Sequence, residues 1–272
     1  SYNTALGTSA LTANTSGANN VAVGTNALDA NTTASNNTAL GYSAGSAVTT
    51  GIRNTLVGAL AGDALTTGYF NTAVGYSALS ADTLGRLSVA VGYGALQTQN
   101  FTSGTDVYNV AVGHNAGQAV TTGVNNTLTG ALAGDALTTG SNNVAIGRDA
   151  LGAETTGQSN IAIGRLALGS QNNTGSPNTY NIGIGTQAGY AITTGYNNTL
   201  IGGLSGDAIT TGHSNTAMGV SSLGANTTGI YNLALGISAL QINTTGVSNV
   251  AVGANALDAN TTASYNTAVG EA

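Results

Sequence analysis

The chain has 272 residues with 41 Gly, one Pro and no Cys or Trp, and it carries only four basic and ten acidic side chains. Charged residues make up 5% of the chain, against roughly 25% in an average globular domain. With so few cations to neutralise phosphates, nucleic acid is not an expected partner. No segment approaches the ~18 consecutive apolar residues of a membrane-spanning helix. The lack of Cys excludes disulfides. A hydrophobic fraction of 41% and a net charge of only −6 argue against disorder.

The predicted elements, in chain order, are sixteen copies of one pentapeptide, Asn-[Thr/Val/Ile/Leu]-Ala-[Val/Leu/Ile]-Gly and its close variants. Thirteen of the fifteen intervals between copies are 17 residues, and the two of 21 begin at Ser88 and Asn160. The copies start at residues 3, 20, 37, 54, 71, 88, 109, 126, 143, 160, 181, 198, 215, 232, 249 and 266. Repetition on this scale predicts a repeat architecture over the whole chain, residues 1–272. Because the chain starts at Ser1 without Met, we expect a processed product or a window on a longer array.

Each repeat, numbered here from position 1 at its first Asn, begins as a short strand and turns at the Gly of position 5. Position 5 is Gly in all sixteen copies, which indicates a backbone conformation or a close approach that a Cβ would block. Seventeen residues are too few for a helical hairpin. They suit one coil of an all-β parallel β-solenoid, here of about 15 coils, in which each coil pairs with the next.

Positions 9 and 12 exchange one aliphatic side chain. Where position 9 is Leu, as at Leu28, position 12 is polar, and where position 9 is Gly, position 12 is aliphatic, as at Val48. The rule holds in all thirteen regular repeats. Because an empty Leu-sized space costs about 2 to 5 kcal/mol, we expect both positions to fill the same layer of the core.

Position 3 suggests an interface between chains. It is Ala in twelve copies, Gly183 in one, and Leu in three. If the side chains of positions 2 and 4 point into the coil, the side chain of position 3 points out of it. Because position 3 is never charged, we expect it to pack closely against another copy of the chain. We therefore expect a homo-oligomer, preferably a trimer, with a monomeric solenoid as the alternative. The expected interface residues include Ala22, Leu56, Leu128 and Leu200.

The pentapeptides "NVAVG" (20–24), "NVAIG" (143–147) and "NIAIG" (160–164) resemble the repeat of trimeric autotransporter adhesin heads, a β-roll in which three chains pack side by side. The longer units "NTAVGYSALSADTLG" and "NTAMGVSSLGANTTG" are similar to repeat arrays in the shafts of bacteriophage tail fibres. The resemblance spans Asn3 to Gly270 and implies a left-handed coil. The 17-residue period, longer than that of the adhesin heads, is a departure.

The residues do not support an active site. His114 and His213 lie about five coils apart, ~24 Å along the axis, which argues against a shared catalytic role. Asp63, Asp135 and Asp207 recur every four coils, ~19 Å apart, too far for a shared metal or a carboxylate pair. The sequence thus predicts no enzyme, no cofactor and no metal site.

The two long repeats are the expected contact regions, because insertions in a solenoid form protruding loops. They lie within "QTQNFTSGTDVY" (97–108) and "GSQNNTGSPNTY" (169–180). The candidate contacts for a host receptor or glycan are Phe101, Asp106, Tyr108, Asn173, Pro177 and Tyr180. The alternative is that these loops only decorate a spacer.

Together these observations predict a structural shaft of an extracellular attachment organelle, most consistent with a phage tail fibre that holds a receptor-binding tip. We expect it on a virion or a cell surface, without insertion into a membrane. The expected partners are further copies of the chain, neighbouring fibre or tip domains, and a host surface glycan or protein. The alternatives are a bacterial trimeric adhesin or extracellular filament and, more remotely, an ice-binding solenoid, because position 13 is Thr in every regular repeat.

Overall fold

The computed structural model describes residues 2–174 and 178–271, which form two compact units that divide between Thr139 and Gly140. The described residues of both units form parallel β-solenoids with one three-residue strand per coil and no helix that could cross a membrane. In the first unit the strands are β1 (Thr4–Leu6), β2 (Val21–Val23), β3 (Thr38–Leu40), β4 (Thr55–Val57), β5 (Thr72–Val74), β6 (Val89–Val91), β7 (Val110–Val112) and β8 (Thr127–Thr129). In the second they are β9 (Val144–Ile146), β10 (Ile161–Ile163), β11 (Ile182–Ile184), β12 (Thr199–Ile201), β13 (Thr216–Met218), β14 (Leu233–Leu235), β15 (Val250–Val252) and β16 (Thr267–Val269).

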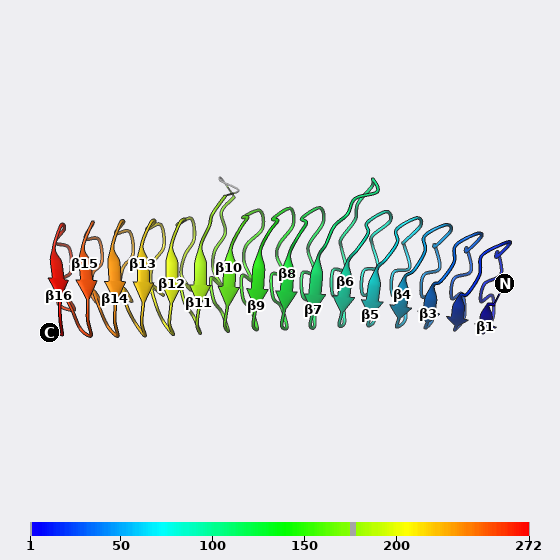
Figure 1. Ribbon diagram of the computed structural model, residues 1–272, viewed down its shortest axis with the longest axis horizontal. Helices are drawn as coiled ribbons and strands as arrows, with labels where there is room; N and C mark the ends of the chain where they lie inside the picture. The colour runs from blue at the N-terminus through cyan, green and yellow to red at the C-terminus, as the bar shows by residue number, and fades with distance from the viewer. Residues whose placement is uncertain (1, 175–177, 272) are drawn as a thin grey trace. The chain divides into compact units, whose positions relative to one another are not determined.

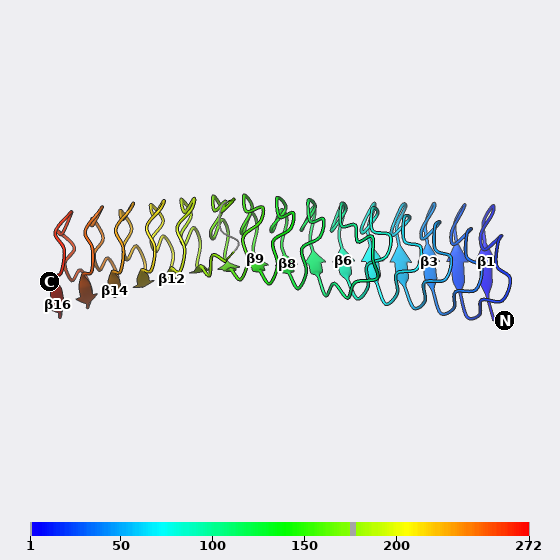
Figure 2. The same cartoon turned by 90° about the horizontal axis from the view of Figure 1, so that it is seen from above.

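Successive strands within each unit pair in parallel and in matched register, so that Ala22 of β2 pairs with Ala39 of β3 (Figure 1). Every strand occupies positions 2 to 4 of its repeat. Figure 2 shows the short strands lying next to one another, with the turns of each coil extending beyond them. The predicted all-β parallel solenoid with a 17-residue coil is thereby confirmed.

The expected direction of the strand side chains is wrong. Position 3, not positions 2 and 4, points into the coil: Ala22, Leu56, Leu128 and Leu200 are all 0% exposed within the single chain. These four residues are core residues and cannot form an interface between copies. The error arose because every residue of the strand is uncharged, so alternation of polarity could not distinguish the inner from the outer face.

The three Leu residues at position 3 fill space left by pairs of Gly at position 9. A Cβ placed on Gly45 would lie 2.6 Å from Leu56 Cδ1, and one on Gly62 would lie 2.8 Å from Leu56 Cδ2. Leu56 therefore occupies the volume that Leu side chains at position 9 take in other coils. Leu128 lies in the same way against Gly117 and Gly134.

The exchange between positions 9 and 12 is confirmed. Leu28 at position 9 and Val48 at position 12 are both fully buried. Position 9 also has a positive φ, 50° at Leu28 and 59° at Gly45. Because Gly adopts such a conformation without strain, Gly can replace Leu at position 9 whenever position 12 supplies the aliphatic group.

Truncation of one such group should be costly. We expect Leu65→Ala to lower the free energy of unfolding by about 2 to 5 kcal/mol, since Gly62 in the same coil cannot refill the cavity. Urea unfolding followed by circular dichroism measures the loss. Ile237→Ala, at a side chain that is 60% exposed, is the control and should change stability by less than about 1 kcal/mol; equal losses would contradict the assignment of Leu65 to the core.

Buried Asn side chains at position 1 connect the coils. The backbone N–H of Asn37 donates to Asn20 Oδ1 at 2.9 Å, and Asn37 Nδ2 donates to the Gly51 carbonyl at 2.8 Å. Position 13 adds a second column of bonds, in which Thr32 Oγ1 donates to the Thr49 carbonyl at 3.2 Å. This bonding gives the Thr column a structural role that does not require ice.

Candidate functional site

The two insertions connect β6 to β7 and β10 to β11, and Figure 1 shows both extending beyond the neighbouring turns. Tyr108 and Tyr180 are about half exposed on them. Asp106 is exposed and forms an ion pair with Arg86 at 3.5 Å. Pro177 lies outside the described residues. The insertions thus present aromatic rings and one carboxylate to solvent.

Two of the expected contact residues are core residues instead. Phe101 is 6% exposed and Asn173 is 4% exposed, so neither side chain presents a surface to a receptor. Both occupy the turn that follows position 12 of a long coil, where their backbone N–H groups donate to a buried carboxylate of the preceding coil. Sequence reasoning placed them on the protruding part of the loop because it could not locate where the extra residues leave the coil.

Buried carboxylates fix the base of each insertion. Asp82 accepts hydrogen bonds from Gly85 N at 3.0 Å, from Gln99 Nε2 at 2.7 Å and from Phe101 N at 3.1 Å. Gln99 Oε1 in turn accepts from Asn109 Nδ2 at 2.9 Å, so the acid terminates a chain of amide donors.

Glu154 has the same role before the second insertion. It accepts from Gly157 N at 2.7 Å, from Gln171 Nε2 at 2.9 Å and from Asn173 N at 3.3 Å. Glu154 is fully buried and therefore lies apart from the surface pair of Arg148 and Asp149, which are 3.3 Å apart. In both units a buried acid precedes an insertion by one coil.

Both His rings stack on Tyr rings of the preceding coil. Tyr76, Tyr93 and His114, all at position 6 of successive coils, stack with ring centroids 5.4 and 5.3 Å apart. His213 stacks on Tyr196 at 4.5 Å. The His rings thus lie in columns of stacked rings. Within residues 2–174 and 178–271, no group of three His, Cys, Asp or Glu residues could hold a metal ion.

The outer face of the strands carries no charged side chain. Positions 2 and 4 of all sixteen strands are Thr, Val, Ile, Leu or Met. Many of these side chains reach solvent: Leu40 is 48% exposed and Met218 is 44% exposed. Within each unit they form two parallel ranks along one side of the solenoid, and this outer strand face replaces position 3 as the candidate interface.

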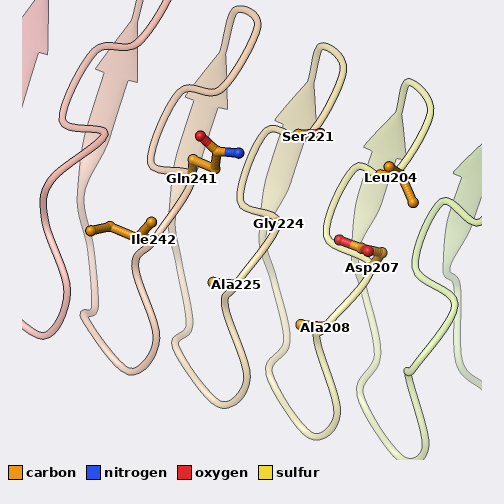
Figure 3. Close-up of a pocket in the computed structure, with 8 residues that line it drawn as sticks. All are labelled: Leu204, Asp207, Ala208, Ser221, Gly224, Ala225, Gln241 and Ile242. Atoms are coloured by element: carbon orange, nitrogen blue, oxygen red, sulfur yellow. The ribbon is translucent and has the colours of Figure 1, made fainter.

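A groove of about 420 Å³ crosses three coils of the second unit, on the turns that follow β12, β13 and β14. Asp207 and Gln241 lie at its two ends, separated by the bare backbone step of Gly224 and Ala225 (Figure 3). The apolar walls include Leu204 and Ile242, and Ser221 and Ala208 complete the lining. The sequence feature that marks this groove is position 10 of three successive coils, which is Asp207, then Gly224, then Gln241.

Three carboxylates have perturbed acidity. Burial raises the pKa of Asp63, Asp82 and Asp207 above the ordinary value of 3.8. For these groups the folded protein binds protons more tightly than the unfolded chain does, so the stability that they contribute is greatest below pH 3.8 and falls as the pH rises through the raised pKa values.

We expect the double variant Asp63→Asn/Asp207→Asn to gain stability relative to the wild type as the pH rises from below 3.8 to 7, because it lacks two carboxylates that must ionise while partly desolvated. Urea unfolding at a series of pH values measures the difference. A difference that stays constant with pH would show that burial does not perturb the two groups.

Comparison with known proteins gives this architecture no family. The chain matches no protein-family model, and no curated protein matches it.

Proposed function

We propose that the chain forms the shaft of an extracellular attachment fibre, most consistent with a phage tail fibre, in which three copies pack side by side. The alternative within the same class is a bacterial trimeric adhesin. The observation that carries the proposal is the outer strand face, whose two ranks of uncharged side chains run along the coils of each unit. The rank at position 4 is Val, Ile, Leu or Met in every strand except β8, where it is Thr129, and an extended apolar rank of this kind is typical of an interface.

The internal bonding supports a mechanical role. Within a unit, strand pairing joins each coil to the next, and the Asn and Thr columns add bonds between regular coils, as from Asn37 to Asn20 and from Thr32 to Thr49. These bonds repeat between neighbouring coils along the axis of each unit, which suits a shaft that transmits force along its length. In this proposal recognition of the host belongs to a tip domain or to exposed rings such as Tyr108 and Tyr180.

Disrupting the outer strand face should separate the copies. We expect the wild type to sediment at three times the 26.4 kDa chain mass and Leu40→Asp to sediment as a single chain, because a charge buried in an apolar interface is strongly unfavourable. Val220→Asp, at a residue 52% exposed outside the strands, is the matched control and should stay assembled. A wild type that sediments at 26.4 kDa would contradict the trimer.

The location is tested separately. Antibodies against the chain, followed by gold labelling and electron microscopy, should decorate fibres on virions. Labelling of a bacterial surface would instead favour the adhesin, and labelling of neither structure would overturn the attachment role.

A further inference from the structure

The groove of the second unit, on the turns after β12, β13 and β14, brings together a carboxylate, an amide and two aliphatic side chains. Its floor is rigid, because Ala208 N donates to the Gly224 carbonyl at 3.2 Å and Ala225 N donates to the Gln241 carbonyl at 2.8 Å. A Cβ on Gly224 would lie 3.5 Å from Asp207 Oδ1, so the carboxylate leans over the bare step. Figure 3 shows Asp207 and Gln241 on opposite sides of that step.

The two polar side chains at the ends of the groove have no side-chain partner within residues 2–174 and 178–271. Among the described residues, neither the Asp207 carboxylate nor the Gln241 amide forms an ion pair or a side-chain hydrogen bond with another residue, although the Asp207 carboxylate accepts from its own backbone N–H. The lining contains no Arg, Lys or His. A partly desolvated carboxylate without a counter-ion favours a cation from outside the groove.

The walls restrict the kind of cation. Leu204 is 39% exposed and Ile242 is 43% exposed, so an occupant that contacts them needs an aliphatic part as well as a charge. A ligand with an anionic group is disfavoured by Asp207 and by the net charge of −6. The chain contains four Arg and no Lys, so it cannot supply such a group from a second copy as a lysine.

We propose that this groove binds an aliphatic primary ammonium group, the chemistry of a lysine side chain or a free alkylamine. The ammonium donates to the Asp207 carboxylate, and the alkyl stem lies along the Gly224 step between Leu204 and Ile242. The Gly224 step provides the space for the ligand. This binding is independent of the assembly of the copies, since the outer strand face is not part of the lining.

The first unit contains a natural control. The residues 144 positions earlier are Asp63, Ser80, Gln97 and Thr98, so the same acid is followed by Ser instead of Gly. Ser80 Oγ donates to the Gln97 carbonyl at 3.5 Å, and Gln97 Oε1 already accepts from Gln118 Nε2 at 3.0 Å. Ser80 thus fills the space that Gly224 leaves open, and the Gln97 amide already has a hydrogen-bond partner. We therefore expect no ammonium to bind beside Asp63.

Saturation-transfer NMR with n-butylammonium chloride at pH 7 tests the proposal on the full chain. We expect saturable binding with a dissociation constant of about 1 to 10 mM, as suits one ion pair and a short apolar stem. Asp207→Asn should weaken binding at least fivefold, and Gly224→Ser at least threefold. Both variants should fold, since Asn is isosteric with Asp and Ser80 occupies the equivalent place of Gly224.

Two controls fix the interpretation. Asp63→Asn should leave the affinity unchanged, and 1-butanol, a neutral ligand of the same length, should bind at least fivefold more weakly than n-butylammonium. Equal binding of the alcohol, an unchanged affinity in Asp207→Asn, or an equal loss in Asp63→Asn would overturn the proposal.

A further comparison identifies the source of the ammonium, once binding is established. Tighter binding of Nα-acetyl-lysine methylamide than of putrescine supports the proposal with a partner protein as the source, and the reverse order supports it with a free diamine.

Discussion

Gly58→Ala should lower the free energy of unfolding by at least about 3 kcal/mol. Gly58 stands at position 5, where φ is +130°, a conformation that costs a residue with a Cβ roughly 1 to 3 kcal/mol. An added Cβ would also lie 2.5 Å from the carbonyl oxygen of Gly75 in the next coil. Because that oxygen belongs to the backbone, the coils must move apart to accommodate the methyl group. Urea unfolding followed by circular dichroism measures the loss.

Gly203→Ala is the matched control for this effect. Gly203 stands at position 6, where Ala59 and Ala131 occur in equivalent coils, and an added Cβ would meet nothing closer than the Thr186 carbonyl at 4.0 Å. The variant should be as stable as the wild type or slightly more so, because Ala reduces the conformational freedom of the unfolded chain. Similar losses in both variants would refute the specific requirement at position 5.

Asp82→Ala should cost about 3 kcal/mol or more and should loosen the first insertion. The substitution leaves three donors, Gly85 N, Gln99 Nε2 and Phe101 N, without their acceptor, and a buried donor without a partner costs about 1 to 3 kcal/mol. Hydrogen exchange should become faster at residues 99–107, while the second unit keeps its protection. Urea unfolding gives the global loss.

The control for Asp82 is Asp106→Ala, which removes the exposed ion pair with Arg86. An exposed pair contributes about 0 to 1 kcal/mol, so this variant should stay near wild-type stability. If Asp106→Ala proved as damaging as Asp82→Ala, the insertion would depend on its surface contact and not on the buried acid.

The repeat pattern predicted much of the core correctly. The sixteen copies can be compared with one another within the single sequence. A coil that lacks Leu at position 9 has an aliphatic residue at position 12, as Leu28 in one coil and Val48 in the next illustrate, and both side chains are buried. Periodicity is informative here because identical coils must satisfy the same packing and hydrogen-bonding requirements.

The candidate sites were less accessible to sequence reasoning. The exposure of Tyr108 and Tyr180 agrees with their expected place on the loops, whereas Phe101 and Asn173 are buried. The groove at Asp207 was not expected, because it depends on the side chains of three successive coils that only stacking brings together.

The sequence by itself determined the coil, its period, its turn at Gly and the total aliphatic content of each layer, because these properties repeat and depend on local conformation. Only the tertiary structure decided which face of the strand points inward, since Thr, Val, Ala and Leu suit both faces of a strand that carries no charge. Closure of the coil places position 3 against position 9, and this contact makes Leu56 a core residue and leaves Leu40 on the surface.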